Sequence, residues 1–149
     1  MSRALHISTA ILSCGILCIA LCAILLQPRS RAASAVIVNG RTIRLEIAAT
    51  PAAMARGLSG RASLDQEAGM LFMLPYRGIH AFWMKGMEFP LDIIWLDEGQ
   101  VVEVATLPAP TSSSYIPRHD PVNPADRVLE LNAGRAKLLD IRPGTTIGI

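Results

Sequence analysis

The chain has 149 residues, a length that suits one domain, and its formal net charge is +2. Three of its 14 basic residues and none of its 12 acidic residues lie within residues 1–35, so residues 36–149 carry a net charge of −1. A near-neutral domain lacks the basic surface that nucleic-acid binding requires, and we expect no nucleic-acid partner.

Residues 1–35 have the character of an export signal. Residues 7–26 form an apolar run without a charge, and Ala33-Ser34-Ala35 is a small-residue cleavage pattern. The run is also about as long as a membrane span, so an uncleaved signal anchor is the alternative to a cleaved signal peptide. Both interpretations predict an exported protein, either periplasmic or anchored on the outer side of the membrane through residues 7–26. All three cysteines lie in this run, so the exported part has no disulfide and no thiol nucleophile.

Residues 36–149 are expected to form a single β-rich domain that begins with a hairpin. Asn39-Gly40 lies between two strand-like runs within residues 36–47. Asn-Gly is the strongest signal for a two-residue hairpin turn, because both turn positions need a positive φ. After the turn, apolar and polar residues alternate, which is typical of a half-buried strand.

A short helix and two strands are predicted next. Thr50-Pro51 is a typical helix start and Gly57 a typical helix end, so residues 52–56 should be helical. Residues 69–74 form a short apolar run that ends before a proline, and we expect a buried strand there. Residues 79–85 should form the following strand.

The stretch from Phe82 to Asp97 contains both tryptophans of the chain. Residues 91–96 are apolar on both faces of a strand apart from Asp92, so this strand should lie centrally in a two-layer structure. Lys85 and Asp92 are set into apolar surroundings, where an unpaired charge is costly. We expect both to have partners, and those predicted are Arg61 or Arg56 for Asp92, and Glu130 for Lys85.

Residues 108–126 contain five of the ten prolines and show no periodicity. A loop of this length in a compact domain is usually functional or disordered. Residues 128–132 resemble a strand and residues 133–139 a short helix. Residues 145–149 alternate and are expected to form a closing strand.

Five motifs occur in an order that resembles domain-of-unknown-function family 192, whose members are small and often exported bacterial and archaeal proteins. They are Arg56-Gly57-Leu58-x-Gly60-Arg61, Gly69-Met70-Leu71-Phe72, Phe82-Trp83-Met84-Lys85, Pro90-Leu91-Asp92-Ile93-Ile94 and Val128-Leu129-Glu130-Leu131-Asn132-Ala133-Gly134. The resemblance implies a mostly β sandwich or barrel, jelly-roll-like, with one or two short helices. It implies no established activity. The family often has Asn-Thr where this chain has Gly86-Met87, so a role for those polar side chains is not expected here.

The polar residues of these motifs predict a small-ligand or envelope-partner binding module. In this interpretation a polar cleft near the central stretch binds a small polar ligand or a cell-envelope component, with one tryptophan as a flat apolar wall. No cofactor is expected. The alternative is that the charges pair internally and only stabilise the fold. The candidate ligand-binding residues are Arg56, Arg61, Trp83, Lys85, Asp92 and Glu130.

Two chemical alternatives use other combinations. An envelope hydrolase would use Asp92 and Glu130 as paired carboxylates. A Cu(I)-binding protein would use thioether and imidazole ligands, which suit that ion. Methionine is also a common filler of apolar cores, and we expect no metal site. The candidate copper ligands are His80, Met84 and Met87.

Overall fold

The computed structural model describes residues 34–149, so the predicted export segment lies outside the described residues except for its last two positions. The described part is mainly β, as predicted, with two short helices. None of its helices has the length and apolar character needed to cross a membrane. The elements are β1 (Ser34–Val38), β2 (Arg41–Ala48), α2 (Pro51–Arg56), β3 (Ala68–Gly78), β4 (Phe82–Trp83), β5 (Leu91–Asp97), β6 (Gln100–Leu107), β7 (Arg118–His119), β8 (Ala125–Asn132) and α3 (Arg135–Leu138).

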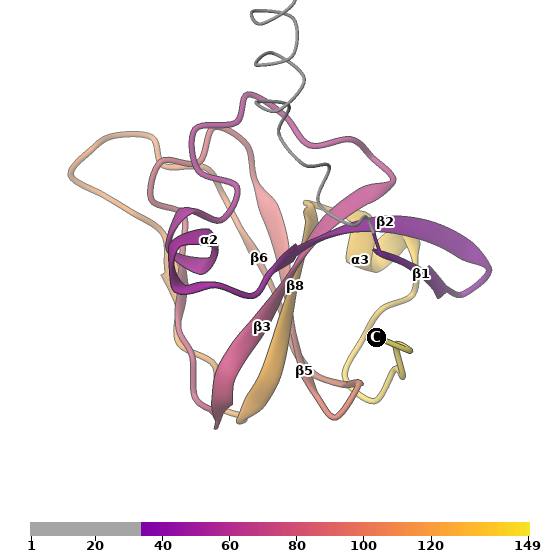
Figure 1. Cartoon of the computed structure of the whole chain (residues 1–149). Coiled ribbons are helices and arrows are strands. Elements are labelled where there is room, and N and C mark those ends of the chain that lie inside the picture. Colours follow the sequence, from indigo (N-terminus) through magenta and orange to yellow (C-terminus); the bar gives the residue numbers. More distant parts are fainter. Residues whose placement is uncertain (1–33) are drawn as a thin grey trace, which may run out of the picture. The chain divides into compact units, whose positions relative to one another are not determined.

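Six strands form one mixed sheet in the order β1-β2-β3-β8-β5-β6, and β4 and β7 form a separate two-stranded ribbon (Figure 1). The end strands β1 and β6 do not pair, so the sheet is not a closed barrel. A jelly roll is built from antiparallel strands in two sheets, whereas β2 and β3 are parallel here. Parallel neighbours need a crossover connection, and the segment that contains α2 provides it.

The first hairpin turn and helix α2 form as predicted. The two turn residues of the first hairpin have φ values of 48° for Asn39 and 79° for Gly40, as the turn requires. The hydroxyl of Thr50 accepts a hydrogen bond from the backbone N of Ala53 at 3.2 Å, and Pro51 opens the helix. The side chain of Asn39 also donates to the carbonyl oxygen of Leu139 at 2.6 Å, which ties the hairpin to the segment after α3.

Strand β5 lies between β8 and β6, and every residue from 91 to 96 is buried. Its two faces belong to two separate hydrophobic clusters. Ile94 and Leu96 belong to the cluster that includes Ala136 of α3, and Ile93 and Trp95 to the cluster that includes Ala53 of α2. The sheet is therefore covered on both faces, which explains why this strand shows no polar face.

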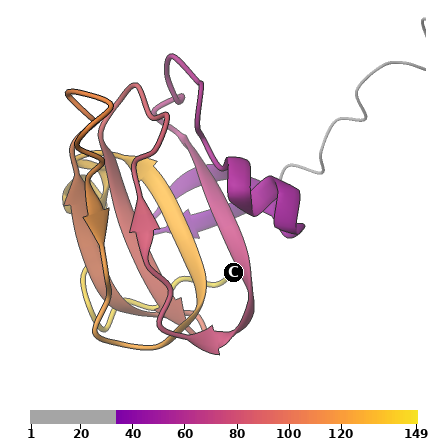
Figure 2. The same ribbon diagram turned by 90° about the vertical axis from the view of Figure 1, so that its left-hand side faces the viewer.

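Helices α2 and α3 lie on opposite sides of the sheet (Figure 1). We call the side of α2 the α2 face and the other side the α3 face. Figure 2 looks onto the α2 face and shows α2 beside β3. The segment from Met84 to Met87 also contributes buried side chains to this face.

Two expectations were wrong. Only Phe82 and Trp83 of the strand predicted at residues 79–85 are extended, and they pair with β7 instead of joining the large sheet. Residues 145–149 form no strand and contribute one isolated bridge, between Gln100 and Thr146. The first strand begins at Ser34, two residues before the predicted domain boundary. The pairing of β4 and of Thr146 depends on partner segments that are distant in the sequence, whereas β1 pairs with the adjacent β2.

Candidate functional site

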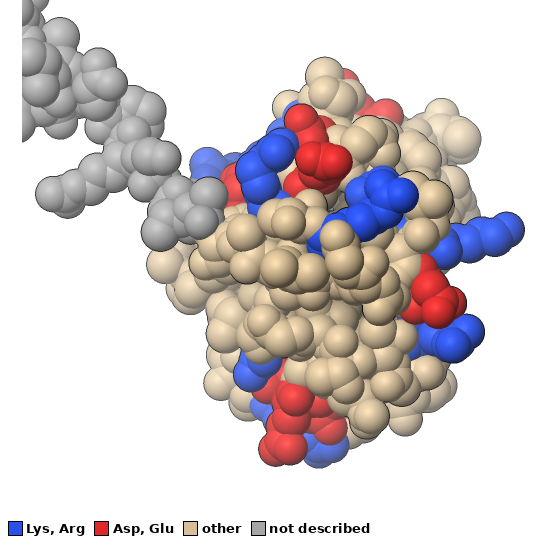
Figure 3. All heavy atoms as spheres, turned by 90° about the vertical axis from the view of Figure 1, so that its right-hand side faces the viewer, with Lys and Arg blue, Asp and Glu red and all other residues tan. Residues whose placement is uncertain are grey.

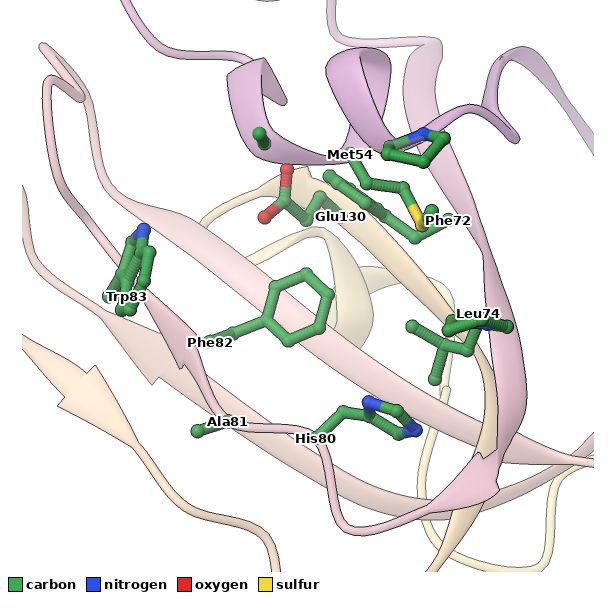
Figure 4. Close-up of a pocket in the computed structure, with 11 residues that line it drawn as sticks. Met54, Phe72, Leu74, His80, Ala81, Phe82, Trp83 and Glu130 are labelled. Carbon is green, nitrogen blue, oxygen red and sulfur yellow. The ribbon is translucent and has the colours of Figure 1, made fainter.

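A pocket of about 310 Å³ lies on the α2 face, between α2, β3 and the segment that leads into β4 (Figure 4). Most of its lining is apolar, and the lining includes the phenyl rings of Phe72 and Phe82 and the indole ring of Trp83. The lining residues are Pro51, Met54 and Ala55 from α2, Phe72, Leu74 and Pro75 from β3, His80, Ala81, Phe82 and Trp83, and Glu130 from β8.

Glu130 is the acidic group of this pocket. It sits in the middle of the sheet, because its backbone is paired with Met70 of β3 on one side and Ile93 of β5 on the other. Its side chain is 6% exposed, and its Oε2 atom has no hydrogen-bond partner among residues 34–149. Burial raises the pKa of this carboxyl group to about 8, because the charged form loses its hydration. At neutral pH the group is therefore mostly protonated.

The aromatic walls of the pocket are held by contacts with the core. The ring of Phe82 meets Phe72 edge to face at 5.1 Å and Trp95 in the same manner at 5.9 Å, both measured between centroids. Such perpendicular contacts are favourable for aromatic quadrupoles. Trp83 follows Phe82 on β4 and points outward, with 56% of its surface exposed. The pocket thus has a rigid aromatic interior and an accessible indole at its edge.

His80 is fixed by two neighbours. Its Nε2 atom donates to the carbonyl oxygen of Tyr76 at 2.9 Å, and its own carbonyl oxygen accepts from the indole N–H of Trp95 at 2.9 Å. With Nε2 as the donor, the Nδ1 atom of the neutral ring is left as an acceptor. Figure 4 shows His80 across Phe82 from Glu130.

Asp92 lies on the α3 face, away from this pocket. Glu130 is paired with Ile93, and adjacent side chains in a strand point to opposite faces. Asp92 is 1% exposed and accepts hydrogen bonds from the hydroxyl of Thr106 at 2.7 Å and the backbone N of Ala136 at 2.8 Å. The predicted arginine partners of Asp92 were wrong: a hydroxyl and a helix N–H satisfy this carboxylate.

The predicted basic residues do not converge on the pocket. Arg61 forms a bidentate pair with Glu46 at 2.6 and 2.8 Å, and this hydrogen bonding raises the pKa of Arg61. Arg56 is exposed at the end of α2. Lys85 is exposed and does not pair with Glu130. It lines a second hollow together with Trp83 and Arg118. Of the six predicted ligand-binding residues, only Trp83 and Glu130 line the pocket on the α2 face.

Many of the other charges are paired at the surface. Basic and acidic groups lie next to one another on the face shown in Figure 3, with no large area of one sign. Ion pairs among the described residues include Arg44–Asp65 at 2.9 Å, Arg77–Asp97 at 2.6 Å and Arg142–Asp140 at 3.2 Å. None of these pairs involves one of the six candidate ligand-binding residues.

The geometry also weighs against the two chemical alternatives. Asp92 and Glu130 lie on opposite faces of the sheet and cannot act as a pair on one substrate. Met84 and Met87 are 0% and 8% exposed and belong to the apolar cluster of the α2 face. Their thioethers fill the core, and the His80 ring is held by Tyr76. No group of three or more acidic, histidine or cysteine side chains among residues 34–149 is arranged to bind a metal ion.

Where the family often has Asn-Thr, this chain has Gly86-Met87, and the backbone conformation at Gly86 favours glycine. Gly86 has a φ of 71°, and a Cβ atom there would lie 2.1 Å from the hydroxyl oxygen of Ser59. Its carbonyl oxygen accepts from the backbone N of Gly60 at 2.8 Å. This close contact joins the turn after α2 to the segment after β4, and Met87 adds an apolar side chain to the core.

Residues 108–126 are anchored to the sheet in part. Glu103 on β6 binds Nε2 of His119 at 2.5 Å and the backbone N of Val122 at 2.9 Å. The ring of His119 also contacts that of Trp95 in a tilted arrangement, with 5.1 Å between centroids. The side chain of Glu103 thus holds the His119 ring and the start of the next segment in place.

The sequence interpretation missed most of the pocket. Met54, Phe72, Leu74 and Phe82 carry no chemical signal of their own and have the character of core residues. In the structure, however, Met54 and Leu74 are only partly buried, because they line the pocket. The usable signal was Glu130, an acidic residue whose neighbours from Val128 to Leu131 are apolar.

Comparison with known families gives a match over nearly all of the described part. Residues 34–149 match the family DUF192, described as Uncharacterized ACR. The chain belongs to this family. DUF192 is a family of unknown function, and no curated protein matches the chain.

Two solved structures are similar to this DUF192 chain. One, from Sinorhizobium meliloti 1021, is described as a candidate transcription regulator; it is 31% identical, with a TM-score of 0.66, and covers 76% of this chain and 88% of its own. The other is a protein of unknown function from Novosphingobium aromaticivorans DSM 12444. It is 28% identical, with a TM-score of 0.66, and covers 83% of this chain and 98% of its own.

Proposed function

We propose that this DUF192 protein is an exported small-ligand binding module whose site is the pocket above Glu130. The observation that carries the proposal is the buried Oε2 atom of Glu130, which has no hydrogen-bond partner among the described residues and lies at an open pocket. A buried polar atom without a partner costs about 1–3 kcal/mol. A ligand that supplies a hydrogen bond would recover that free energy, whereas a purely structural residue at this position would be better replaced by an apolar one.

The remaining features of the pocket fit ligand binding. Its volume is at the small end of the range for ligand pockets, about 300–1,000 Å³. Such pockets combine apolar and aromatic walls with a few polar groups that orient the ligand. Here Phe72, Phe82 and Trp83 are the walls and Glu130 is the orienting group.

Export is also part of the proposal. Its support is the charge-free run of residues 7–26 and the small residues after it. The module would act in the periplasm or on the outer side of the membrane, either released or anchored. Transcription regulation, the role named for the S. meliloti protein, is not included, because a net charge of −1 over residues 36–149 provides no electrostatic attraction to DNA.

Methyl NMR of the full chain, purified in a nonionic detergent with labelled methionine methyl groups, tests the binding function. Met54 lines the pocket, whereas Met73, between Phe72 and Leu74 on β3, does not. Members of a library of small polar and aromatic compounds should shift the Met54 signal and leave the Met73 signal in place. Trp83→Ala should weaken those ligands roughly three- to tenfold, the contribution of one aromatic contact.

Tyr115→Ala is the matched control for Trp83→Ala, because Tyr115 is a comparably exposed ring outside the pocket lining. It should leave the affinities unchanged. A library that moves no Met54 signal, or ligands equally weakened by both substitutions, would refute a binding function for this pocket.

An enzyme remains the second candidate because of one observation. A carboxyl group with a pKa near 8 is protonated at neutral pH, as a general acid must be. Asp92 cannot be its partner, so the pocket itself offers only His80 as a second titratable group. Incubation of the protein with fragments of envelope polymers, followed by detection of new chain ends, tests this candidate. Turnover that is lost in Glu130→Gln would favour it over simple binding.

A further inference from the structure

Resting on the proposed binding function, we propose that the pocket takes a small organic ammonium ion, which binds the carboxylate of Glu130 through its N–H groups and packs its apolar body on Phe82 and Trp83. The argument has three parts: the hydrogen-bonding groups of the pocket, the charges around it, and the faces of its walls. Each part excludes a class of ligand.

Once Glu130 is ionised, the polar groups that face the ligand are acceptors. The ionised carboxylate of Glu130 can only accept hydrogen bonds, and Nδ1 of His80 accepts when the ring is neutral. A ligand rich in N–H donors therefore matches the pocket. A sugar needs many polar partners of both kinds, and the other lining residues, which are apolar or aromatic, do not provide them.

The charge distribution favours a cation. No lysine or arginine lines the pocket, so an anionic ligand would meet an acidic group without compensation. Among charged residues of the elements beside Glu130, Arg77 of β3 and Asp97 of β5 pair with each other. Asp92 of β5 lies on the α3 face, and Arg56 of α2 is exposed and outside the lining.

The walls suit a cation that carries an apolar body. Figure 4 shows the carboxyl group of Glu130 between Trp83 on one side and Met54 and Phe72 on the other, with Phe82 opposite. Cations are attracted to the faces of aromatic rings, most strongly to tryptophan. The indole of Trp83 is at the rim, where an incoming cation would meet it first.

Binding of such a cation must displace a proton. Burial holds the pKa of Glu130 at about 8, so at pH 7 the carboxyl group is mostly protonated. When the ammonium ion binds, the O–H bond of the carboxyl group breaks, the proton passes to solvent, and the carboxylate accepts N–H groups of the ligand. Close to one proton should be released for each ligand bound at pH 7, and affinity should increase with pH up to about 8.

Benzylammonium and benzyl alcohol are matched probes, because they share an apolar ring and differ in charge. Titrations use the full chain in a nonionic detergent, followed by the Met54 methyl signal and by calorimetry in two buffers of different ionisation enthalpy. Benzylammonium should bind more tightly, release about one proton, and lose roughly fiftyfold in affinity from pH 8 to pH 6. Benzyl alcohol should show neither proton release nor this pH dependence.

Glu130→Gln should weaken benzylammonium roughly tenfold to hundredfold, the contribution of hydrogen bonds to a charged group, and leave benzyl alcohol unaffected. Glu88→Gln makes the same chemical change at an exposed position outside the pocket and should change neither probe. If Glu130→Gln does not fold, the pH dependence and proton release of the unmodified protein decide the question.

An ammonium group can belong to a free amine or to the headgroup of an aminolipid. Tighter binding of phosphorylethanolamine than of ethylammonium would identify the headgroup, and the reverse order would identify the free amine. Equal affinity for benzylammonium and benzyl alcohol, with no proton release, would overturn the ammonium assignment and leave the binding function standing. If neither these probes nor any other compound shifts Met54, the binding function itself falls.

Discussion

At the scale of single residues, Glu130 links pH to stability. Its pKa is about 8 in the folded protein and 4.5 in its ordinary state, so the folded chain binds the proton more tightly than the unfolded chain. Well below pH 4.5 the carboxyl group is protonated in both states, so its ionisation does not change the free energy of unfolding. As pH increases from 4.5 toward 8, the unfolded state ionises first, and the folded state loses stability relative to it.

We predict that Glu130→Gln removes this loss. The variant and the unmodified protein should be about equally stable at pH 4.5, and the variant should be about 3 kcal/mol more stable at pH 7, from 1.36 kcal/mol per pH unit. Chemical denaturation at several pH values measures the difference. Glu88→Gln, at an exposed position, should show no such trend, and a difference that stays constant with pH would mean that Glu130 ionises freely in the folded state.

At the scale of elements, Asp92 holds three of them together. Its carboxylate lies on β5 and accepts hydrogen bonds from Thr106 on β6 and from the backbone N of Ala136 in α3. Helix α3 has only four residues, too few to be stable without tertiary contacts. The carboxylate of Asp92 accepts from one of the backbone N–H groups that have no partner within so short a helix.

We therefore predict that Asp92→Asn destabilises the domain by about 1–3 kcal/mol, the cost of leaving a buried donor poorly satisfied. An amide can accept at one oxygen only, and its NH₂ group would face a donor. Asp97→Asn is the control, because Asp97 forms an exposed pair with Arg77, and exposed pairs contribute little. Equal effects of the two substitutions in urea denaturation would show that Asp92 does not fasten α3.

At the scale of the whole molecule, residues 34–149 have the properties of a self-contained domain. Together the two hydrophobic clusters of the described part draw on β1, β2, β3, β5, β6 and β8, and the hairpin of β1 and β2 packs into the cluster that includes Ala136. A chain from Ser34 to Ile149 should be soluble and unfold in one cooperative transition. Calorimetry and denaturation followed by two probes would check this, and an aggregated or non-cooperative product would contradict it.

The start of β1 adds a detail to this prediction. Ser34 and Ala35 pair with Leu45 and Arg44, so cleavage after Ala35 would remove two of the five paired positions of β1. A chain that begins at residue 36 should therefore be less stable than one that begins at Ser34. Comparison of the two under identical conditions measures what these positions contribute.

The sequence by itself determined the features that depend on neighbouring residues. Asn39-Gly40 requires a turn with positive φ, and Thr50-Pro51 provides a helix cap and a helix start, wherever these segments lie in the fold. The continuous apolar run of β5 indicated a strand covered on both faces. The five ordered motifs indicated the family, and the family match over residues 34–149 confirms it.

The tertiary structure decided which of these elements meet. Strands β2 and β3 pair in parallel through a crossover connection. No local pattern in the sequence specifies which strands will become neighbours. The pocket is assembled from α2, β3, β4 and β8, whose lining residues have the character of core residues when they are considered one at a time. The separation of Asp92 from Glu130 depends on register: Glu130 pairs with Ile93, and a shift of one residue would bring both carboxylates to the same face. That register is selected by the burial of two complete apolar faces at once, which is a property of the assembled sheet and of no single segment.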